Sequence, residues 1–171
     1  MPCHVITRGN NRQACFFKAS DYQLYLECLR DACSRYNVVL HAYVLMTNHV
    51  HLLMTPETSD GISRVMQSIG RRYVQHVNVK YGRTGTLWEG RHKASLVEEE
   101  AYLLACYRYI ELNLVRAEMV KKTISYPWTS YAENIEVKPQ AMTNRHSIYE
   151  RLGLDESRRH VACKAFYGLK E

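Results

Sequence analysis

Two histidines separated by one residue, His49 and His51, are the first candidates for chemistry in this sequence. Side chains alternate between the two faces of a β-strand, so a strand here places both imidazoles on one face and Val50 in the core on the other. Two neutral imidazoles side by side can bind a divalent cation and leave room for oxygen ligands. With 8 histidines in 171 residues, the pattern is expected by chance roughly 0.4 times. Spacing alone therefore favours the alternative, a pair of solvent-facing histidines on the open side of a strand.

A second set of candidates lies on a segment with helical spacing that leads to Asn113. Residues four apart share a helix face, so Tyr109 lies above Asn113, and Tyr107 lies above Glu111 on nearly the opposite face. A phenol titrates near pH 10 and needs a metal or a base to become a nucleophile. Each pair offers a phenol and an oxygen ligand, so spacing leaves the choice open. It also leaves open that all these tyrosines pack in a core or an interface.

Strands and helices alternate along the chain in an order that would position these residues. Alternation and β-branched content predict strands at 3–7, 38–45, 50–54 and 94–97. Apolar periodicity predicts helices at 20–36, 60–82 and 98–116, with shorter ones near 144–152 and 155–166. Ser20 with Gln23 forms a capping-box pattern, and Asp60 can cap the second helix. The order β-α-β-β-α-β is typical of an α+β fold with a ferredoxin-like antiparallel sheet and helices on one face.

Length and charge limit the possible functions. At 171 residues the chain can bury a core without staples, and we expect a main domain at 1–131 with a helical C-terminal extension at 132–171 packed on it. The net charge of +6 favours a nucleic-acid partner. The six cysteines contain no C-x-x-C pair and are interpreted as reduced core residues. No apolar run is long enough for a membrane span, and no signal-peptide core is evident, so a cytoplasmic protein without membrane contact is expected.

Four segments together resemble one protein family. Residues 47–53, Thr-Asn-His-Val-His-Leu-Leu, resemble the HUH motif of single-tyrosine transposases. Residues 109–117 resemble the nucleophile helix of the repeat-associated (REP-associated) tyrosine transposases of the IS200-like family, whose pattern is Tyr-Ile-x-x-Asn-Pro-Val-Arg-Ala; Leu114 stands at the Pro position. Residues 7–13 are similar to the N-terminal loop of this branch, and residues 87–93 to its basic strand entry.

The resemblance chooses between the two helix pairs and implies a reaction. It implies that Tyr109 is the nucleophile, that His49, His51 and Asn113 bind Mg²⁺ or Mn²⁺, and that Glu111 lies outside the site. The implied activity is cutting and rejoining of single-stranded DNA beside a hairpin, through a 5′-phosphotyrosine intermediate. The implied partner is single-stranded or hairpin DNA, and the protein would act as a monomer or a homodimer.

Other function classes fit less well. The histidine pair precedes the tyrosine, whereas conjugative relaxases resemble the reverse order. Histidine-triad hydrolases need a third alternating histidine, where Leu53 stands, and the paired His-x-Thr phosphoesterases need a motif that is absent. A replication-initiator nickase of the same chemistry and a catalytically silent hairpin-DNA-binding regulator remain as alternatives.

Basic, amide and aromatic residues near these motifs are the candidates for DNA contact, because single strands are usually bound by cations and stacking platforms. Solvated charge and core packing are the alternatives for each of them. The candidates are Arg8, Asn10, Asn11, Arg12, Arg71, Arg72, Lys80, Arg83, Trp88, Arg91 and Lys93.

Overall fold

The computed structural model describes residues 1–98, 100–116, 125–135, 138–139, 141–153, 155, 157–158, 161–162 and 165, without the side chains of 114–116. Four strands form an antiparallel sheet in the order β2-β3-β1-β4. Their bounds are Cys3–Arg8 for β1, Val38–Met46 for β2, His49–Pro56 for β3 and Lys93–Leu96 for β4. With its two crossover helices, this order confirms the predicted α+β fold with a ferredoxin-like sheet.

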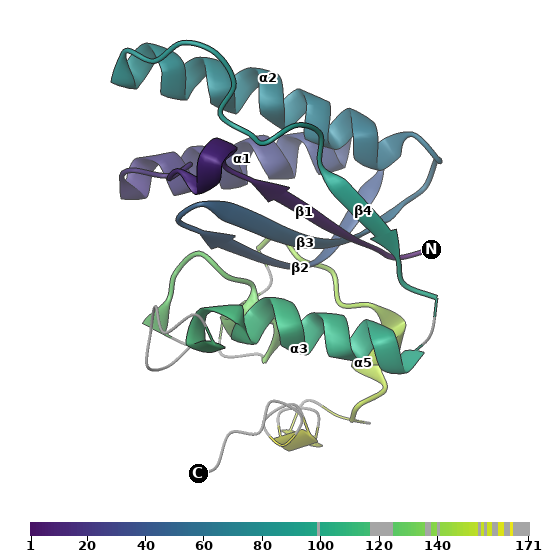
Figure 1. Ribbon diagram of the computed structural model, residues 1–171. Coiled ribbons are helices and arrows are strands. Elements are labelled where there is room, and N and C mark those ends of the chain that lie inside the picture. The colour runs from purple at the N-terminus through teal and green to yellow at the C-terminus, as the bar shows by residue number, and fades with distance from the viewer. Residues whose placement is uncertain are drawn as a thin grey trace.

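Helices cover both faces of the sheet (Figure 1). Helices α1 (Ala19–Arg35) and α2 (Gly61–Tyr81) pack together on one face over the larger apolar core. Helix α3 (Glu100–Arg116) crosses the opposite face over a second, smaller core. The sheet therefore has no open side at its centre, and polar residues on the α3 face are enclosed between a strand and a helix.

The register of β1 against β3 determines which residues lie beneath α3. Val50, Leu52 and Met54 of β3 belong to the core on the α1 and α2 face, so His49 and His51 project toward α3. The pairing of Ile6 with His51 brings β1 alongside β3 at this point. The strand alternation predicted for the histidine pair is confirmed.

The helix starts differ in part from the predicted caps. At α1 the capping-box prediction for Ser20 and Gln23 is wrong, because the Asp21 carboxylate accepts the backbone N–H groups of Phe17 and Lys18 at 3.0 and 2.9 Å. Asp60 occupies the N-cap position of α2, but its carboxylate accepts the Thr58 hydroxyl and makes no capping bond to the backbone. These differences leave the helices within a few residues of their predicted bounds.

A tight turn after β1 requires glycine. Gly9 forms a bridge with Trp88 and donates its N–H to the Asn48 carbonyl at 2.8 Å. A Cβ at Gly9 would lie 2.2 Å from the Gln13 carbonyl oxygen, which no side chain tolerates. The short helix η1 (Asn10–Arg12) is therefore held close to the turn between β2 and β3.

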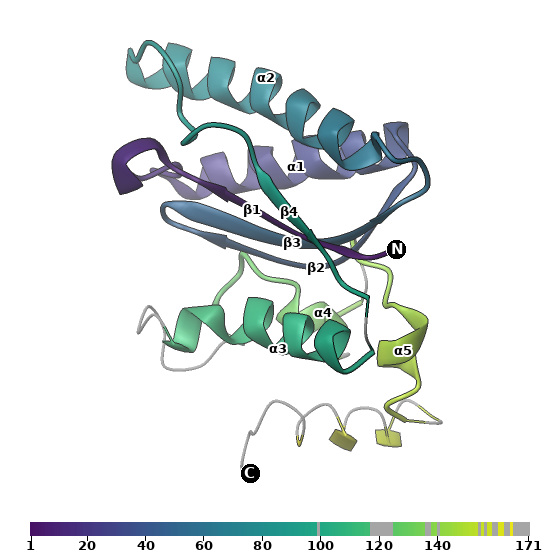
Figure 2. The ribbon, with the colours of Figure 1, turned by 45° about the vertical axis from the view of Figure 1, so that its right-hand side comes forward.

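The described chain between residues 125 and 150 lies partly along the outer strand β2 (Figure 2). The backbone N–H of Leu45 bonds to Trp128, that of Ser130 to Tyr43, and that of Asn144 to Leu40. Pairing of this kind covers an edge strand that would otherwise be open to other chains. The segment includes the short helices α4 (Tyr131–Asn134) and α5 (Ser147–Glu150). Most of the predicted 155–166 helix lies outside the described residues.

The five described cysteines are buried free thiols, as predicted; Cys163 lies outside the described residues. Within the described part of the chain, none of the helices combines the length and apolar character needed to cross a membrane.

Candidate active site

The histidine pair lies beneath α3 and is far less exposed than expected. His51 is 1% exposed and His49 is half-buried. The sequence-based alternative of solvent-facing histidines is therefore wrong for His51, because α3 covers that face of the sheet. The imidazole rings of His49 and His51 are 5.0 Å apart between centroids, at a steep interplanar angle.

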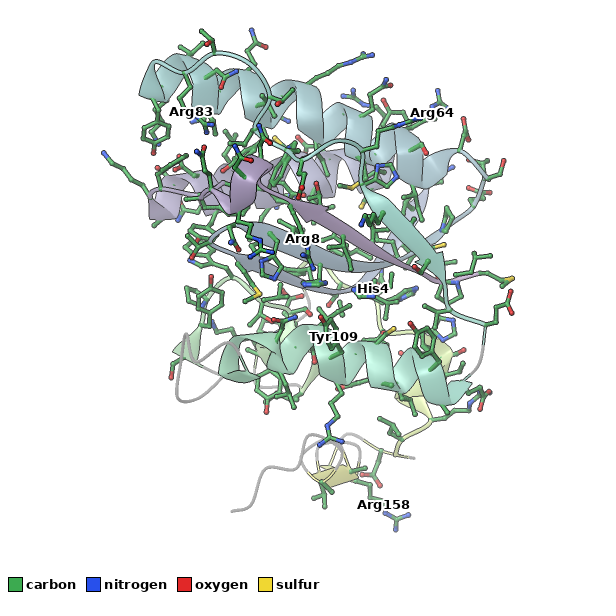
Figure 3. All side chains as sticks on the ribbon, viewed as in Figure 1. His4, Arg8, Arg64, Arg83, Tyr109 and Arg158 are labelled. Carbon is green, nitrogen blue, oxygen red and sulfur yellow. The ribbon has the colours of Figure 1, made fainter. Side chains whose placement is uncertain are left out.

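Tyr109 and Asn113 project from α3 toward these histidines. The Asn113 amide nitrogen lies 3.3 Å from His51 Nε2. The Tyr109 ring lies 5.4 Å from the His51 ring between centroids, in an edge-on arrangement. Tyr109 remains 39% exposed, and Figure 3 shows its side chain directed from α3 toward the sheet. A phenol, an amide and two imidazoles thus converge from two elements far apart in the sequence.

Tyr107 and Glu111 lie on the other side of α3, in a structural network. The Glu111 carboxylate is fully buried and accepts Ser130 Oγ–H at 2.7 Å and Asn134 Nδ2–H at 2.6 Å. Tyr107 is also fully buried, and its hydroxyl oxygen accepts the backbone N–H of His146 at 3.0 Å. Of the two pairs that spacing left open, the structure brings only Tyr109 and Asn113 to the histidines.

A third histidine, His4, adjoins the site and was missed in the sequence. Its Nε2 lies 3.1 Å from His51 Nδ1, with the two rings stacked at 5.3 Å. Its ring also contacts Tyr109 edge-on at 5.9 Å. His4 lies on the same face of β1 as Ile6, the partner of His51 across the strands. Alternation along β1 is enough to place His4 on the same face as Ile6, but only the register between β1 and β3 shows that His4 lies beside His51.

Hydrogen bonds leave the Nε2 atoms of His49 and His51 as the candidate ligand atoms. His49 Nδ1 lies 2.7 Å from Asn48 Oδ1, and since an amide oxygen only accepts, His49 must carry its proton on Nδ1. The matching contact of His51 Nδ1 is with His4 Nε2. Both rings are thus held through Nδ1, the arrangement common in histidines that bind metals through Nε2.

The site favours neutral imidazoles. Burial lowers the pKa of His51 to about 3, with smaller contributions from the nearby His49, His4 and Arg8 charges. Burial also lowers the pKa of His49, with Arg8 contributing, and burial lowers the pKa of His4. Each ring therefore keeps its lone pairs near neutral pH, as binding of a divalent cation requires.

The residues present fit a divalent cation only if an amide takes part. Across the described residues, no group of three or more His, Cys, Asp or Glu side chains is arranged to hold a metal ion. Asn113 is an amide 3.3 Å from His51 Nε2, and rotating its amide by a half-turn presents the oxygen in place of the nitrogen. Two imidazoles and one amide oxygen form a donor set that can coordinate a divalent cation, with water or phosphate completing the shell.

A cavity opens beside Tyr109. It has a volume of about 430 Å³ and is lined by His4, Tyr102, Ala105, Cys106, Arg108 and Tyr109. The tyrosine ring therefore faces both the histidines and a space that is open to solvent. A polymer could approach the phenol through this side.

The predicted DNA contacts lie in different settings. Arg8 pairs with His49 in the strand register and is exposed beside the site (Figure 3). Arg72 forms an ion pair with Asp31 at 2.8 Å, and Lys80 one with Asp21 at 2.7 Å, so both already serve to connect α1 and α2. The remaining candidates divide into exposed residues, which are Asn10, Asn11, Arg12, Arg71, Arg91 and Lys93, and half-buried ones, which are Arg83 and Trp88.

Comparison with known proteins places the chain in a family. The family described as "Transposase IS200 like" matches residues 1–113, well over half of the chain. The chain belongs to the IS200-like transposases. No curated protein sequence matches it significantly.

Two solved structures are similar to this IS200-like transposase. The first is a REP-associated tyrosine transposase bound to a REP hairpin, with 15% sequence identity, 86% of each chain covered and a TM-score of 0.65. The second is a candidate transposase from Deinococcus radiodurans R1, with 21% identity, 61% of this chain and 85% of that one covered, and a TM-score of 0.48. At such low identity the first likeness supports the fold.

Proposed function

We propose that this IS200-like transposase is a metal-dependent single-stranded DNA endonuclease and strand transferase that cuts beside hairpin-forming repeats. The observation that carries the proposal is the convergence of Tyr109 and Asn113 on His49 and His51, at distances of a few ångström, in a chain of this family. A nucleophile, a cation site and an approach for DNA then lie within one small region.

Tyr109 is the proposed nucleophile. Attack of its oxygen on phosphorus forms a 5′-phosphotyrosine bond while the bond from phosphorus to the 3′ oxygen breaks; the phenol loses its proton and the leaving strand gains one as a 3′-hydroxyl. Attack by a 3′-hydroxyl on the phosphotyrosine reverses these changes and frees Tyr109. Each broken phosphorus–oxygen bond is replaced by another, so rejoining needs no external energy source.

His49, His51 and Asn113 are the proposed ligands of Mg²⁺ or Mn²⁺. When bound, the ion would supply positive charge next to the scissile phosphate. We further propose that Asn48 and His4 are positioning residues, because each contacts the Nδ1 of one ligand histidine and so keeps its Nε2 unprotonated. Arg8, exposed beside His49, would contribute a permanent positive charge for the DNA backbone.

The proposed substrate is a DNA hairpin with an adjoining single strand. The similar REP-associated transposase is bound to a REP hairpin, and the net charge of +6 suits a polyanion. The sequence resemblance of residues 7–13 and 87–93 to the same branch supports this choice over the initiator-type nickase.

The test is a covalent-adduct assay with a hairpin oligonucleotide carrying a single-stranded flank, with Mn²⁺ and with chelator. We expect a protein–DNA band that survives denaturation, requires the metal and disappears in Tyr109→Phe. Binding of the hairpin without any adduct under all metal conditions would instead identify a hairpin-binding regulator.

A further inference from the structure

A second cavity lies on the opposite face of the sheet from the histidines. It has a volume of about 330 Å³ and opens between α2 and the segment that precedes β4, above the end of β1. Gly90, at its rim, has φ 66°, a conformation that glycine adopts easily and that turns the segment around the opening. The cavity is lined by Thr7, Tyr25, Ser63, Met66, Gln67, Ile69, Gly70, Trp88, Gly90, Arg91 and His92.

An aromatic wall and a tyrosine that carries a buried hydroxyl line the cavity. Tyr25 reaches it from α1 and is fully buried, and its hydroxyl has no hydrogen-bond partner within the described part of the chain. A buried polar group without a partner is costly and rare in folded proteins. Trp88 is half-buried, stacked near Tyr73 at 6.2 Å and edge-on to Tyr25 at 6.2 Å, so its indole is held in place.

The charge of the lining selects among possible occupants. None of its lining residues is acidic, while Arg91 is exposed at the rim with His92 next to it. Ligand sites for small molecules begin at roughly 300 Å³, so the space suits one flat ring system and not a length of duplex. A planar ring that can hydrogen-bond and that is attached to a phosphate matches the aromatic wall, the unpaired hydroxyl and the positive charge at the rim.

We propose that this cavity holds one unpaired nucleobase of the DNA strand, stacked on Trp88 and hydrogen-bonded to the Tyr25 hydroxyl, with Arg91 beside its phosphate. The inference rests on the proposed function in one respect, that the protein binds single-stranded DNA, and it does not depend on the chemistry at Tyr109. The site lies across the sheet from the histidines, so it serves to anchor the strand. Gln67, exposed on the α2 side, offers the amide that would read the outer edge of the base.

Trp88 provides a direct probe of the cavity. The chain has two tryptophans, so Trp128→Phe leaves Trp88 as the single indole, and Tyr109→Phe in the same protein prevents cleavage during titration. The ligand is a hairpin oligonucleotide whose single-stranded flank carries an abasic site, moved one nucleotide at a time. We expect Trp88 emission to be quenched by the intact oligonucleotide, with one abasic position restoring the emission and weakening binding roughly tenfold.

Tyr25→Phe separates a ligand role from a structural one. Removing an unpaired buried hydroxyl should leave the melting temperature of the free protein unchanged or raise it. It should weaken binding of the intact oligonucleotide about fivefold and leave binding of the critical abasic oligonucleotide unchanged. Tyr73→Phe is the matched control, because Tyr73 is also fully buried but its hydroxyl donates to the Cys15 carbonyl at 2.6 Å. Loss of this hydroxyl should lower the melting temperature and leave the quenching of Trp88 by DNA unchanged.

The inference is overturned if Trp88 emission is the same with and without saturating DNA, or if Tyr25→Phe lowers the melting temperature and binds every oligonucleotide as the parent does. Failure of the proposed function looks different. If DNA quenches Trp88 emission but the protein with Tyr109 intact forms no covalent adduct, the nucleobase site is supported and the proposed nuclease activity is refuted.

Discussion

Replacing one tyrosine of α3 at a time distinguishes the proposed nucleophile, Tyr109, from its buried neighbour Tyr107. Tyr109→Phe removes an oxygen from a side chain that is 39% exposed, so we expect a change in the free energy of unfolding within about 0.5 kcal/mol. The covalent adduct with the hairpin oligonucleotide should disappear, while hairpin affinity stays within about twofold of the parent, the factor that 0.5 kcal/mol corresponds to.

Tyr107→Phe should show the opposite pattern. It leaves the backbone N–H of His146 without the oxygen that accepts it at 3.0 Å, at a position with no exposure. Loss of such a bond costs about 1–2 kcal/mol, which corresponds to a fall in melting temperature of roughly 2–8 °C for a domain of this size. Adduct yield per folded molecule should be unchanged.

Both variants are measured by thermal unfolding, fluorescence anisotropy with labelled hairpin, and a denaturing gel for the adduct. Peptide mapping of the adduct by mass spectrometry identifies the modified residue. The assignment fails if the DNA-bearing peptide carries its nucleotide on Tyr107, or if Tyr109→Phe still forms the adduct.

Three further outcomes follow from the geometry of the site and its surroundings. Glu111→Ala removes the buried carboxylate that accepts hydrogen bonds from Ser130 and Asn134, so the free energy of unfolding should fall by about 2–4 kcal/mol. Mn²⁺ affinity below the melting transition should be retained, and loss of metal binding in the folded variant would make Glu111 a ligand. His4→Leu should weaken Mn²⁺ binding by about 10–100-fold, as measured by electron paramagnetic resonance. His4→Gln keeps a hydrogen-bond acceptor and should recover part of this affinity. If His4→Leu binds Mn²⁺ as tightly as the parent protein, His4 contributes packing alone. If about five phosphates are neutralised, log affinity for single-stranded DNA should fall with log salt at a slope of roughly −3.5. Arg72→Ala should leave that slope unchanged, because the Arg72 guanidinium already forms an ion pair with Asp31. A slope near zero would mean that the basic residues form only a solvated surface.

Sequence patterns predicted the fold and much of the geometry of the candidate site, because both depend on local periodicity. Alternation along β3 placed His49 and His51 on one face, and helical spacing paired Tyr109 with Asn113. The two helix pairs could not be separated in this way. What distinguishes the two pairs is the segment after α3, whose Ser130 and Asn134 donate hydrogen bonds to the Glu111 carboxylate. No periodic signal in that segment predicts its path along β2.

His4 and the burial of His51 escaped prediction for a related reason. Strand register and the position of a covering helix are tertiary facts, set by which apolar faces find each other. The α3 face of the sheet carries Ala42, Val44 and Leu53 together with the histidines, and α3 packs on those apolar residues. The same packing that completes the smaller core thereby brings the phenol and the amide over the imidazoles.

The burial of each histidine also decides which of the two gives the clearer test of the proposed cation site. His51 is 1% exposed and contacts His4, Asn113 and Tyr109. His51→Ala therefore removes packing as well as a proposed ligand, and it should cost about 2–4 kcal/mol of stability. His49 is half-buried and its side chain bonds to the neighbouring Asn48, so His49→Ala should cost about 1 kcal/mol. Both variants should abolish the adduct if both imidazoles bind the ion, but only His49→Ala does so in a protein of nearly parental stability. Metal-dependent adduct formation by folded His49→Ala, at the parental rate, would remove the histidine pair from the proposed mechanism.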